Sequence, residues 1–128
     1  MSKQIAIVAG GVQIRAELDD TPTAEAMAAA LPVEGRVNRW GGEIYFAVPV
    51  DVDLEDSARE VLEAGELAYW PPGKMFCVFF GATPASQGDE IRAASAVNVF
   101  GQVKGELDGL WRVPDGAKVK AALTSECG

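Results

Sequence analysis

Two pairs of adjacent glycines, Gly10-Gly11 and Gly41-Gly42, each separate two apolar-rich stretches, and in most of these apolar and polar residues alternate. Alternation with a period of two is typical of a strand with one buried face. Glycine pairs suit the tight turn of a β-hairpin, because glycine adopts a positive φ at little cost. The first pair predicts a hairpin between Lys3–Ala9 and Val12–Leu18. We therefore expect a chain built mainly from antiparallel strands.

Six further segments have the composition of strands, which makes eight with the first hairpin. They are residues 33–40, 43–48, 66–70, 74–80, 96–103 and 117–123. About eight strands close a barrel whose interior is filled by side chains, and closure removes the exposed edges of the sheet. The sequence thus predicts a mostly β protein, an eight-stranded closed barrel in one domain that spans residues 1–128.

Two segments favour helix. Pro22 follows the potential caps Asp20 and Thr21, and apolar residues then recur at helical spacing until Pro32, which predicts a helix over residues 23–31. A further helical turn is expected within residues 57–64, because Ser57 and Glu60 have capping-box spacing and Gly65 follows.

The composition excludes several kinds of function. The 128 residues contain 11 Lys and Arg against 19 Asp and Glu, so the net charge of -8 repels phosphate backbones and anionic lipids. We therefore expect neither nucleic acid nor membrane partners. The chain has no histidine, which removes Ser-His and Cys-His catalysis and every metal site that contains histidine.

Cofactor and metal signatures are also missing from the sequence. No Walker loop, dinucleotide-binding glycine motif or Cys-x-x-Cys pair occurs, so we expect no cofactor and no zinc. The acidic residues 51–56 lack the glycine of a calcium loop and are expected to form a solvated edge. With no export signal, the sequence predicts a cytoplasmic protein; Cys77, in an apolar run, is expected to be a buried thiol, and Cys127 to lie in a frayed tail.

The Gly41-Gly42 turn predicts the best candidate site. A two-residue turn places Trp40 opposite Glu43, so alternate side chains share a face. That face carries Asn38, Trp40, Glu43 and Tyr45, and the opposite face carries Val37, Ile44, Phe46 and Val48. The first face is too aromatic for a solvated surface and too polar for a barrel interior, although a cross-strand aromatic pair under a loop is an equally simple interpretation.

Long motifs in the chain carry a family resemblance. Residues 38–46 (NRWGGEIYF), 69–74 (YWPPGK) and 95–99 (SAVNV) resemble a group of small prokaryotic cyclophilin-like proteins of unknown function. The resemblance implies a closed barrel with a helix covering one end. The strand near Phe100-Gly101 resembles a late strand of the cyclophilins, with Val97 at the position of their active-site histidine and a short helix following at residues 107–111.

The isomerase pattern of the cyclophilins is broken here. Their arginine is followed by aromatic and polar residues in an Arg-Phe-Met-x-Gln pattern, of which only Arg39-Trp40 resembles the start. We therefore expect prolyl isomerase activity to be absent or very weak, and a weak isomerase stays an alternative to a binding module.

Three classes of function stay open. The first is a binding module for a small molecule or peptide, neutral or cationic, with a ligand site of Asn38, Trp40, Glu43, Tyr45, Phe79, Phe80 and Asn98. The second is an enzyme that uses Glu43 as an acid or base. The third is a structural, homo-oligomer-forming protein with an interface at residues 69–72. The aromatic segment 69–73 either extends the ligand site or packs in the core.

Overall fold

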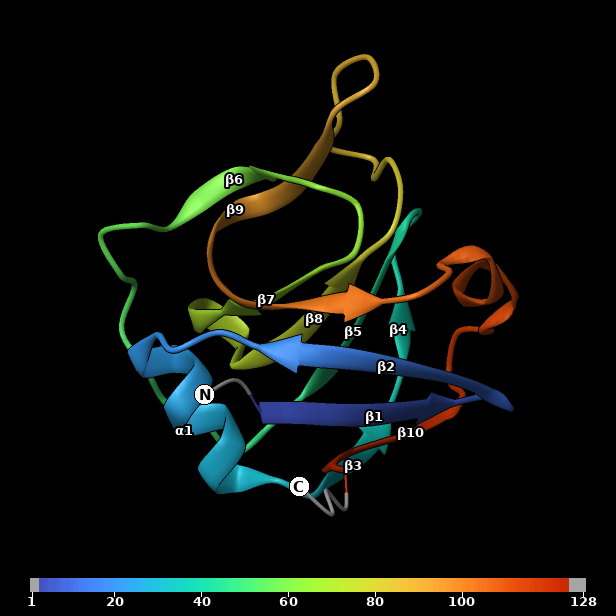
Figure 1. Cartoon of the computed structure of the whole chain (residues 1–128). Coiled ribbons are helices and arrows are strands. Elements are labelled where there is room, and N and C mark those ends of the chain that lie inside the picture. The colour runs from blue at the N-terminus through green and yellow to red at the C-terminus, as the bar shows by residue number, and fades with distance from the viewer. Residues whose placement is uncertain (1–2, 125–128) are drawn as a thin grey trace.

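The computed structural model describes residues 3–124. Within this range the chain forms ten strands, one α-helix and two short 3-10 helices (Figure 1). The strands are β1 (Lys3–Ala9), β2 (Val12–Leu18), β3 (Val33–Arg36), β4 (Asn38–Arg39), β5 (Glu43–Ala47), β6 (Arg59–Leu62), β7 (Glu66–Trp70), β8 (Met75–Phe79), β9 (Ile91–Lys104) and β10 (Lys118–Leu123). The helices are α1 (Pro22–Ala30), η1 (Pro71–Gly73) and η2 (Asp108–Arg112).

The strands form one antiparallel sheet in the order β3-β10-β1-β2-β9-β7-β8-β5-β4, and β6 pairs with β9 beside this path. The first hairpin is as predicted: Ala9 pairs with Val12, and the turn glycines Gly10 and Gly11 both have positive φ. The predicted helix is also present. The side chain of Thr21 caps α1 by accepting a hydrogen bond from the backbone of Ala24 at 3.1 Å.

The prediction of a closed eight-stranded barrel is not confirmed. In residues 3–124 the sheet has ten strands, and no hydrogen-bonded ladder joins its two ends. Two changes account for the ten strands: β6 is additional, and the expected strand 33–40 divides at Val37 into β3, which pairs with β10, and β4, which pairs with β5. One continuous segment thus forms both ends of the sheet, and a strand bent in this way cannot pair with itself.

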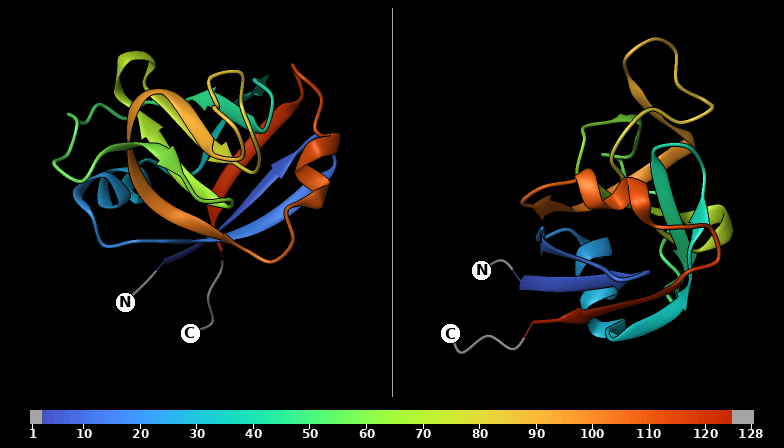
Figure 2. Two further views of the ribbon diagram at one scale, coloured as in Figure 1. Left: turned by 90° about the horizontal axis from the view of Figure 1, so that it is seen from above. Right: turned by 90° about the vertical axis from the view of Figure 1, so that its right-hand side faces the viewer.

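The main core fills the interior enclosed by the curved sheet (Figure 2). Its largest fully buried side chains include Phe46, Phe76 and Phe100, with Phe46 stacked on Phe76 at 4.7 Å between ring centroids. Met27 of α1 and Leu110 of η2 join this core from opposite sides of the molecule in Figure 1. Buried side chains therefore occupy the interior that the curved sheet encloses.

A second layer lies over the outer face of the sheet. Strand β9 begins at Ile91 rather than at the predicted residue 96, and its first half pairs with β6 (Figure 1). The helical turn predicted within residues 57–64 is wrong, since β6 occupies this segment. The capping-box signal is local, whereas β9 supplies a strand partner from 30 residues away, and tertiary pairing overrides the local preference. No helix in the described part of the chain is long and apolar enough to cross a membrane.

Candidate functional site

The β4–β5 hairpin has the register that the sequence predicts. Asn38 pairs with Tyr45, and the backbone N–H of Trp40 donates to the carbonyl of Glu43 at 3.0 Å across the Gly41-Gly42 turn. The face of Val37 and Phe46 is buried in the main core. Trp40, Glu43 and Tyr45 consequently lie on the outer face of the sheet, opposite that core.

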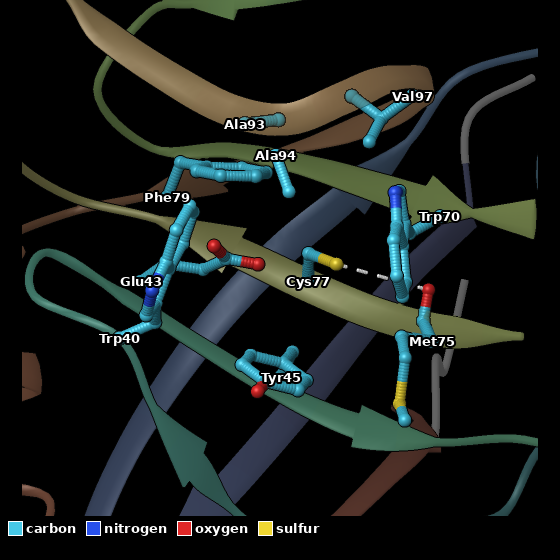
Figure 3. A pocket seen from close by; sticks show the side chains of 10 residues that line it. All are labelled: Trp40, Glu43, Tyr45, Trp70, Met75, Cys77, Phe79, Ala93, Ala94 and Val97. Carbon is cyan, nitrogen blue, oxygen red and sulfur yellow. Dashed lines mark hydrogen bonds between the residues drawn. The ribbon is translucent and has the colours of Figure 1, made fainter. Parts of the chain in front are cut away.

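Beneath the second layer this outer face is hollowed into a pocket of about 110 Å³. Its lining comes from the turn and four strands: Trp40, Glu43, Tyr45, Trp70, Met75, Cys77, Phe79, Ala93, Ala94 and Val97. Figure 3 shows Trp40 and Trp70 on opposite sides of the pocket, with Cys77 between them on β8 and Ala93 and Val97 above on β9. A space remains because the side chains that β9 contributes are short. Four aromatic rings line this space: Trp40, Tyr45, Trp70 and Phe79.

Glu43 is the charged residue of the pocket. Its side chain points toward the space above Cys77 (Figure 3), and the residue is only 5% exposed. Within residues 3–124 it forms no salt bridge. Burial raises the pKa of Glu43 from 4.5 to about 7, and the neighbouring Cys77 thiol opposes this shift. Near neutral pH the pocket therefore holds a carboxyl group divided between its neutral and charged forms.

Cys77 forms part of the floor of the pocket and is buried, as predicted. The thiol donates to the carbonyl of Met75 at 3.8 Å (Figure 3). Burial raises the pKa of this thiol well above the ordinary value, and the nearby carboxylate of Glu43 raises it further. The thiolate is the nucleophilic form of cysteine, so this environment keeps Cys77 in its inert form. Cys127 lies outside the described residues.

Three of the candidate ligand residues lie outside the pocket. Asn38 is exposed and donates to the carbonyl of Tyr45. Phe80 belongs to the main core and packs edge-on against Trp111 at 4.8 Å. Asn98 is fully buried, and its amide donates hydrogen bonds to the carbonyl of Asp53 and to the hydroxyl of Thr23. These bonds connect α1 with the loop that follows β5. The role of Asn98 in the structure is to position this loop.

Arg39 lies on the opposite face of the sheet from Trp40. Its guanidinium donates to the carbonyl of Val113 at 2.8 Å and to that of Gly41 at 3.0 Å, and it lies over the ring of Phe80. These contacts hold η2 against the end of the main core. The arginine is therefore engaged away from the pocket.

Long-range contacts contribute the pocket residues that the ligand-site prediction lacks. Trp70 lies in the aromatic segment that the sequence marks as an extension of the site or a piece of the core. The segment divides between the two places, since Tyr69 is buried in the core whereas Trp70 lines the pocket and donates to Ser95 Oγ at 2.7 Å. Met75 and Cys77 lie on β8, where they pair with Ala47 and Tyr45 of β5. Alternation along β8 could have predicted that these two side chains share one face of the sheet. Ala93, Ala94 and Val97 carry no sequence signal of a site.

The acidic segment that follows β5 gives the solvated edge that was expected. Asp51 and Asp53 are exposed, and Asp51 lies 3.7 Å from the ammonium of Lys74.

Comparison with known proteins assigns the chain to a family without assigning an activity. A search of curated proteins gives no match. Among solved structures, a hypothetical protein from Archaeoglobus fulgidus, determined in solution, is 41% identical, with 96% of this chain and 95% of that chain covered at a TM-score of 0.83. The family model described as cyclophilin-like matches residues 3–122. The chain belongs to the cyclophilin-like family.

Proposed function

We propose that this protein is a binding module that takes a small molecule into the pocket between β5, β7, β8 and β9. The observation that carries the proposal is the carboxyl group of Glu43, which is almost fully buried, faces an open space and has no cation beside it in the described residues. Burying such a group without a charged partner weakens a fold. A ligand that donates hydrogen bonds or carries positive charge would compensate this cost.

The rest of the lining supports a ligand with an apolar body. Trp40, Tyr45, Trp70 and Phe79 offer flat aromatic surfaces, and the phenol of Tyr45 adds one further polar group. A mainly apolar pocket with few convergent polar groups is typical of small-molecule sites. A ligand with a planar body and a donor at one edge suits this combination, whereas an anion would be repelled by Glu43.

Benzamide and benzoate form a matched pair of probes for this proposal, because they share a ring but differ in whether the polar edge donates or is anionic. At pH 8 we expect benzamide to shift the indole N–H resonances of Trp40 and Trp70 in a ¹⁵N spectrum and benzoate to leave them unchanged. Trp111 lies outside the pocket against Phe80 and serves as an internal reference. Equal responses to the two probes, or shifts confined to Trp111, would refute the proposal.

Acid–base catalysis by Glu43 is the second candidate, favoured by its pKa of about 7, which suits a group that exchanges protons at neutral pH. No second catalytic group accompanies it, since the other titratable side chains of the lining are Tyr45 and Cys77, whose pKa values are both raised. Chemical conversion of a bound ligand, followed by NMR and abolished by Glu43→Gln, would favour catalysis over binding alone.

A further inference from the structure

The arrangement of rings around Glu43 narrows the class of ligand. We infer that the pocket of the proposed binding function accepts a methylated ammonium group, with the charge facing Glu43 and the methyl groups against the surrounding aromatic rings. The inference rests on the proposed function and adds the chemical identity of the group that is bound. Three features of the pocket carry it: its walls, its supply of acceptors and its size.

The walls suit a cation with an apolar surface. Trp40 and Trp70 lie on opposite sides of the space in Figure 3, and the rings of Tyr45 and Phe79 line it between them. The face of an aromatic ring is electrically negative and attracts a cation, with tryptophan the strongest of the three aromatic residue types. The aromatic rings and the buried carboxylate therefore favour positive charge, whereas Met75, Cys77 and the small side chains of β9 form neutral parts of the lining.

The supply of acceptors disfavours an unmethylated ammonium. A primary ammonium carries three N–H donors that each need an acceptor once they leave water. The pocket lining offers three acceptor oxygens, two on the Glu43 carboxylate and one on the Tyr45 phenol, and both side chains belong to β5. The three N–H groups of an ammonium diverge, so all of them would have to point toward this one strand, because the remaining side chains are apolar or sulfur-containing, or, in the tryptophans, carry only a donor. A methylated ammonium has no such requirement, since its methyl groups pack against the rings and its charge is spread over them.

The size of the pocket agrees with this group. An apolar cavity of about 150 Å³ holds one benzene molecule. The space beside Glu43, at about 110 Å³, is somewhat smaller, so it encloses one compact group of a few heavy atoms, such as a trimethylammonium or the amide of benzamide, and leaves a benzamide ring only partly enclosed. The rest of a longer ligand would then extend toward solvent past the half-buried edges of Trp40 and Trp70.

Choline and two analogues of it test the inference. In 3,3-dimethylbutan-1-ol a carbon atom replaces the nitrogen, so shape is kept and charge is lost, whereas ethanolamine keeps the charge and loses the methyl groups. Titrated at pH 8 against the three tryptophan indole resonances, choline is expected to shift those of Trp40 and Trp70 and not that of Trp111. Its Kd should be about tenfold lower than that of either analogue.

Two variants test whether the preference for choline depends on the carboxylate of Glu43, and a third tests one aromatic wall. Glu43→Gln should raise the Kd for choline about tenfold and leave that for 3,3-dimethylbutan-1-ol unchanged. Glu34→Gln is the matched control, because Glu34 is exposed on β3, away from the pocket, and its replacement alters the net charge equally. Trp70→Leu removes one wall without touching the carboxylate and should reduce the preference for choline over its neutral isostere, while the carboxylate retains part of it.

The pH dependence of choline binding gives an independent readout. Choline keeps its charge at every pH, so any change in its affinity comes from the protein. Of the titratable residues that line the pocket, Tyr45 on β5 and Cys77 on β8 have raised pKa values and stay neutral between pH 6 and pH 8, whereas Glu43 ionises in this range. We therefore expect the affinity for choline to increase several-fold from pH 6 to pH 8 in the wild type and to stay constant in Glu43→Gln.

The outcomes separate this inference from the function on which it rests. Equal affinity for choline and 3,3-dimethylbutan-1-ol would overturn the inference and leave a pocket that selects by shape. Equal affinity for ethanolamine would overturn it in favour of hydrogen bonding. If choline fails to shift Trp40 and Trp70 while benzamide does, the inference falls and the proposed function stands; if benzamide also fails to shift them, both fall.

Discussion

Glu43 differs from Asn98 and Thr23, which are also buried and polar, in the groups that lie within reach of its side chain. Asn98 and Thr23 are hydrogen-bonded to each other, and Thr23 also donates to the carboxylate of Glu55. The carboxyl group of Glu43 has a thiol beside it instead, and burial raises its pKa to about 7. Because a carboxyl with a raised pKa is more easily buried when protonated, this one residue makes the stability of the protein depend on pH.

Replacement of Glu43 by glutamine should remove that dependence. The carboxyl stabilises the folded protein fully below pH 4.5, its ordinary pKa, and the contribution is lost as the pH rises through about 7. From pH 4.5 to pH 8 the free energy of unfolding of the wild type should fall by about 3 kcal/mol relative to Glu43→Gln. Urea unfolding of both proteins across this range measures the difference. The exposed Glu34→Gln should follow the wild type, and parallel curves for wild type and Glu43→Gln would contradict the prediction.

Cys77 should be unreactive in the folded protein. Its thiol is buried and is kept protonated by burial and by the nearby carboxylate of Glu43. In a Cys127→Ser background, where Cys77 is the remaining thiol, we expect iodoacetamide to label the native protein far more slowly than the unfolded protein, as followed by mass spectrometry. Similar rates in the two states would show that the floor of the pocket is open to solvent.

At the scale of elements, the position of Glu43 depends on close contact between the β4–β5 turn and the chain after β8. The backbone of Gly42 donates to the carbonyl of Ala82 at 2.7 Å and accepts from Phe80 at 2.8 Å. A Cβ atom on Gly42 would lie 2.3 Å from the backbone of Gly81, which a side-chain rotation cannot relieve. This turn therefore needs glycine for the close approach of two backbones.

Gly42→Ala should consequently weaken the fold and disturb the pocket. We expect a loss of about 1–3 kcal/mol in the free energy of unfolding, because the turn must move away from Gly81. Gly35→Ala on β3 is the control, since a Cβ there meets its nearest atom at 3.8 Å and the backbone needs no positive φ. Chemical denaturation should show that Gly35→Ala is at least as stable as the wild type. Equal losses in the two variants would mean that the close approach is unimportant.

The elements that the sequence predicts correctly are those fixed by local chemistry. Both glycine turns, the Thr21-capped helix and the shared face of Trp40, Glu43 and Tyr45 depend on residues a few positions apart. The errors arise where a partner is distant in sequence. Strand β6 forms because β9 pairs with it, and the pocket exists because Ala93 and Val97 of β9 lie over β8. No local pattern in the sequence predicts such contacts. The prediction of Asn98 as a ligand residue fails for the same reason, because its hydrogen-bond partners, Thr23 and Asp53, are distant in sequence.

At the scale of the whole molecule, membership of the cyclophilin-like family does not bring prolyl isomerase activity with it. Arg39 is bound at the end of the main core, whereas the pocket lies on the outer face of the sheet. Val97 lines the pocket at the position where the resemblance to the cyclophilins implies their active-site histidine, and it offers no polar group. The residues that the isomerase motif would need are thus separated or replaced.

We therefore expect no acceleration of cis–trans exchange in a standard proline-peptide assay, even at high protein concentration. The uncatalysed rate is slow enough that weak activity is readily detected. Robust turnover that Arg39→Ala abolishes would contradict this expectation, provided that circular dichroism shows the variant to be folded.

The position of β10 has a consequence for how the protein forms during synthesis. This strand lies between β3 and β1 in the sheet, and Leu123 pairs with Ile5 from the other end of the described chain. A ribosome therefore releases β1 and β3 long before the strand that joins them exists. Until then the chain can make its hairpins but cannot enclose its core, and Ile5 and Val33 lack the neighbour that covers them. The sheet can therefore enclose its core only after β10 has left the ribosome.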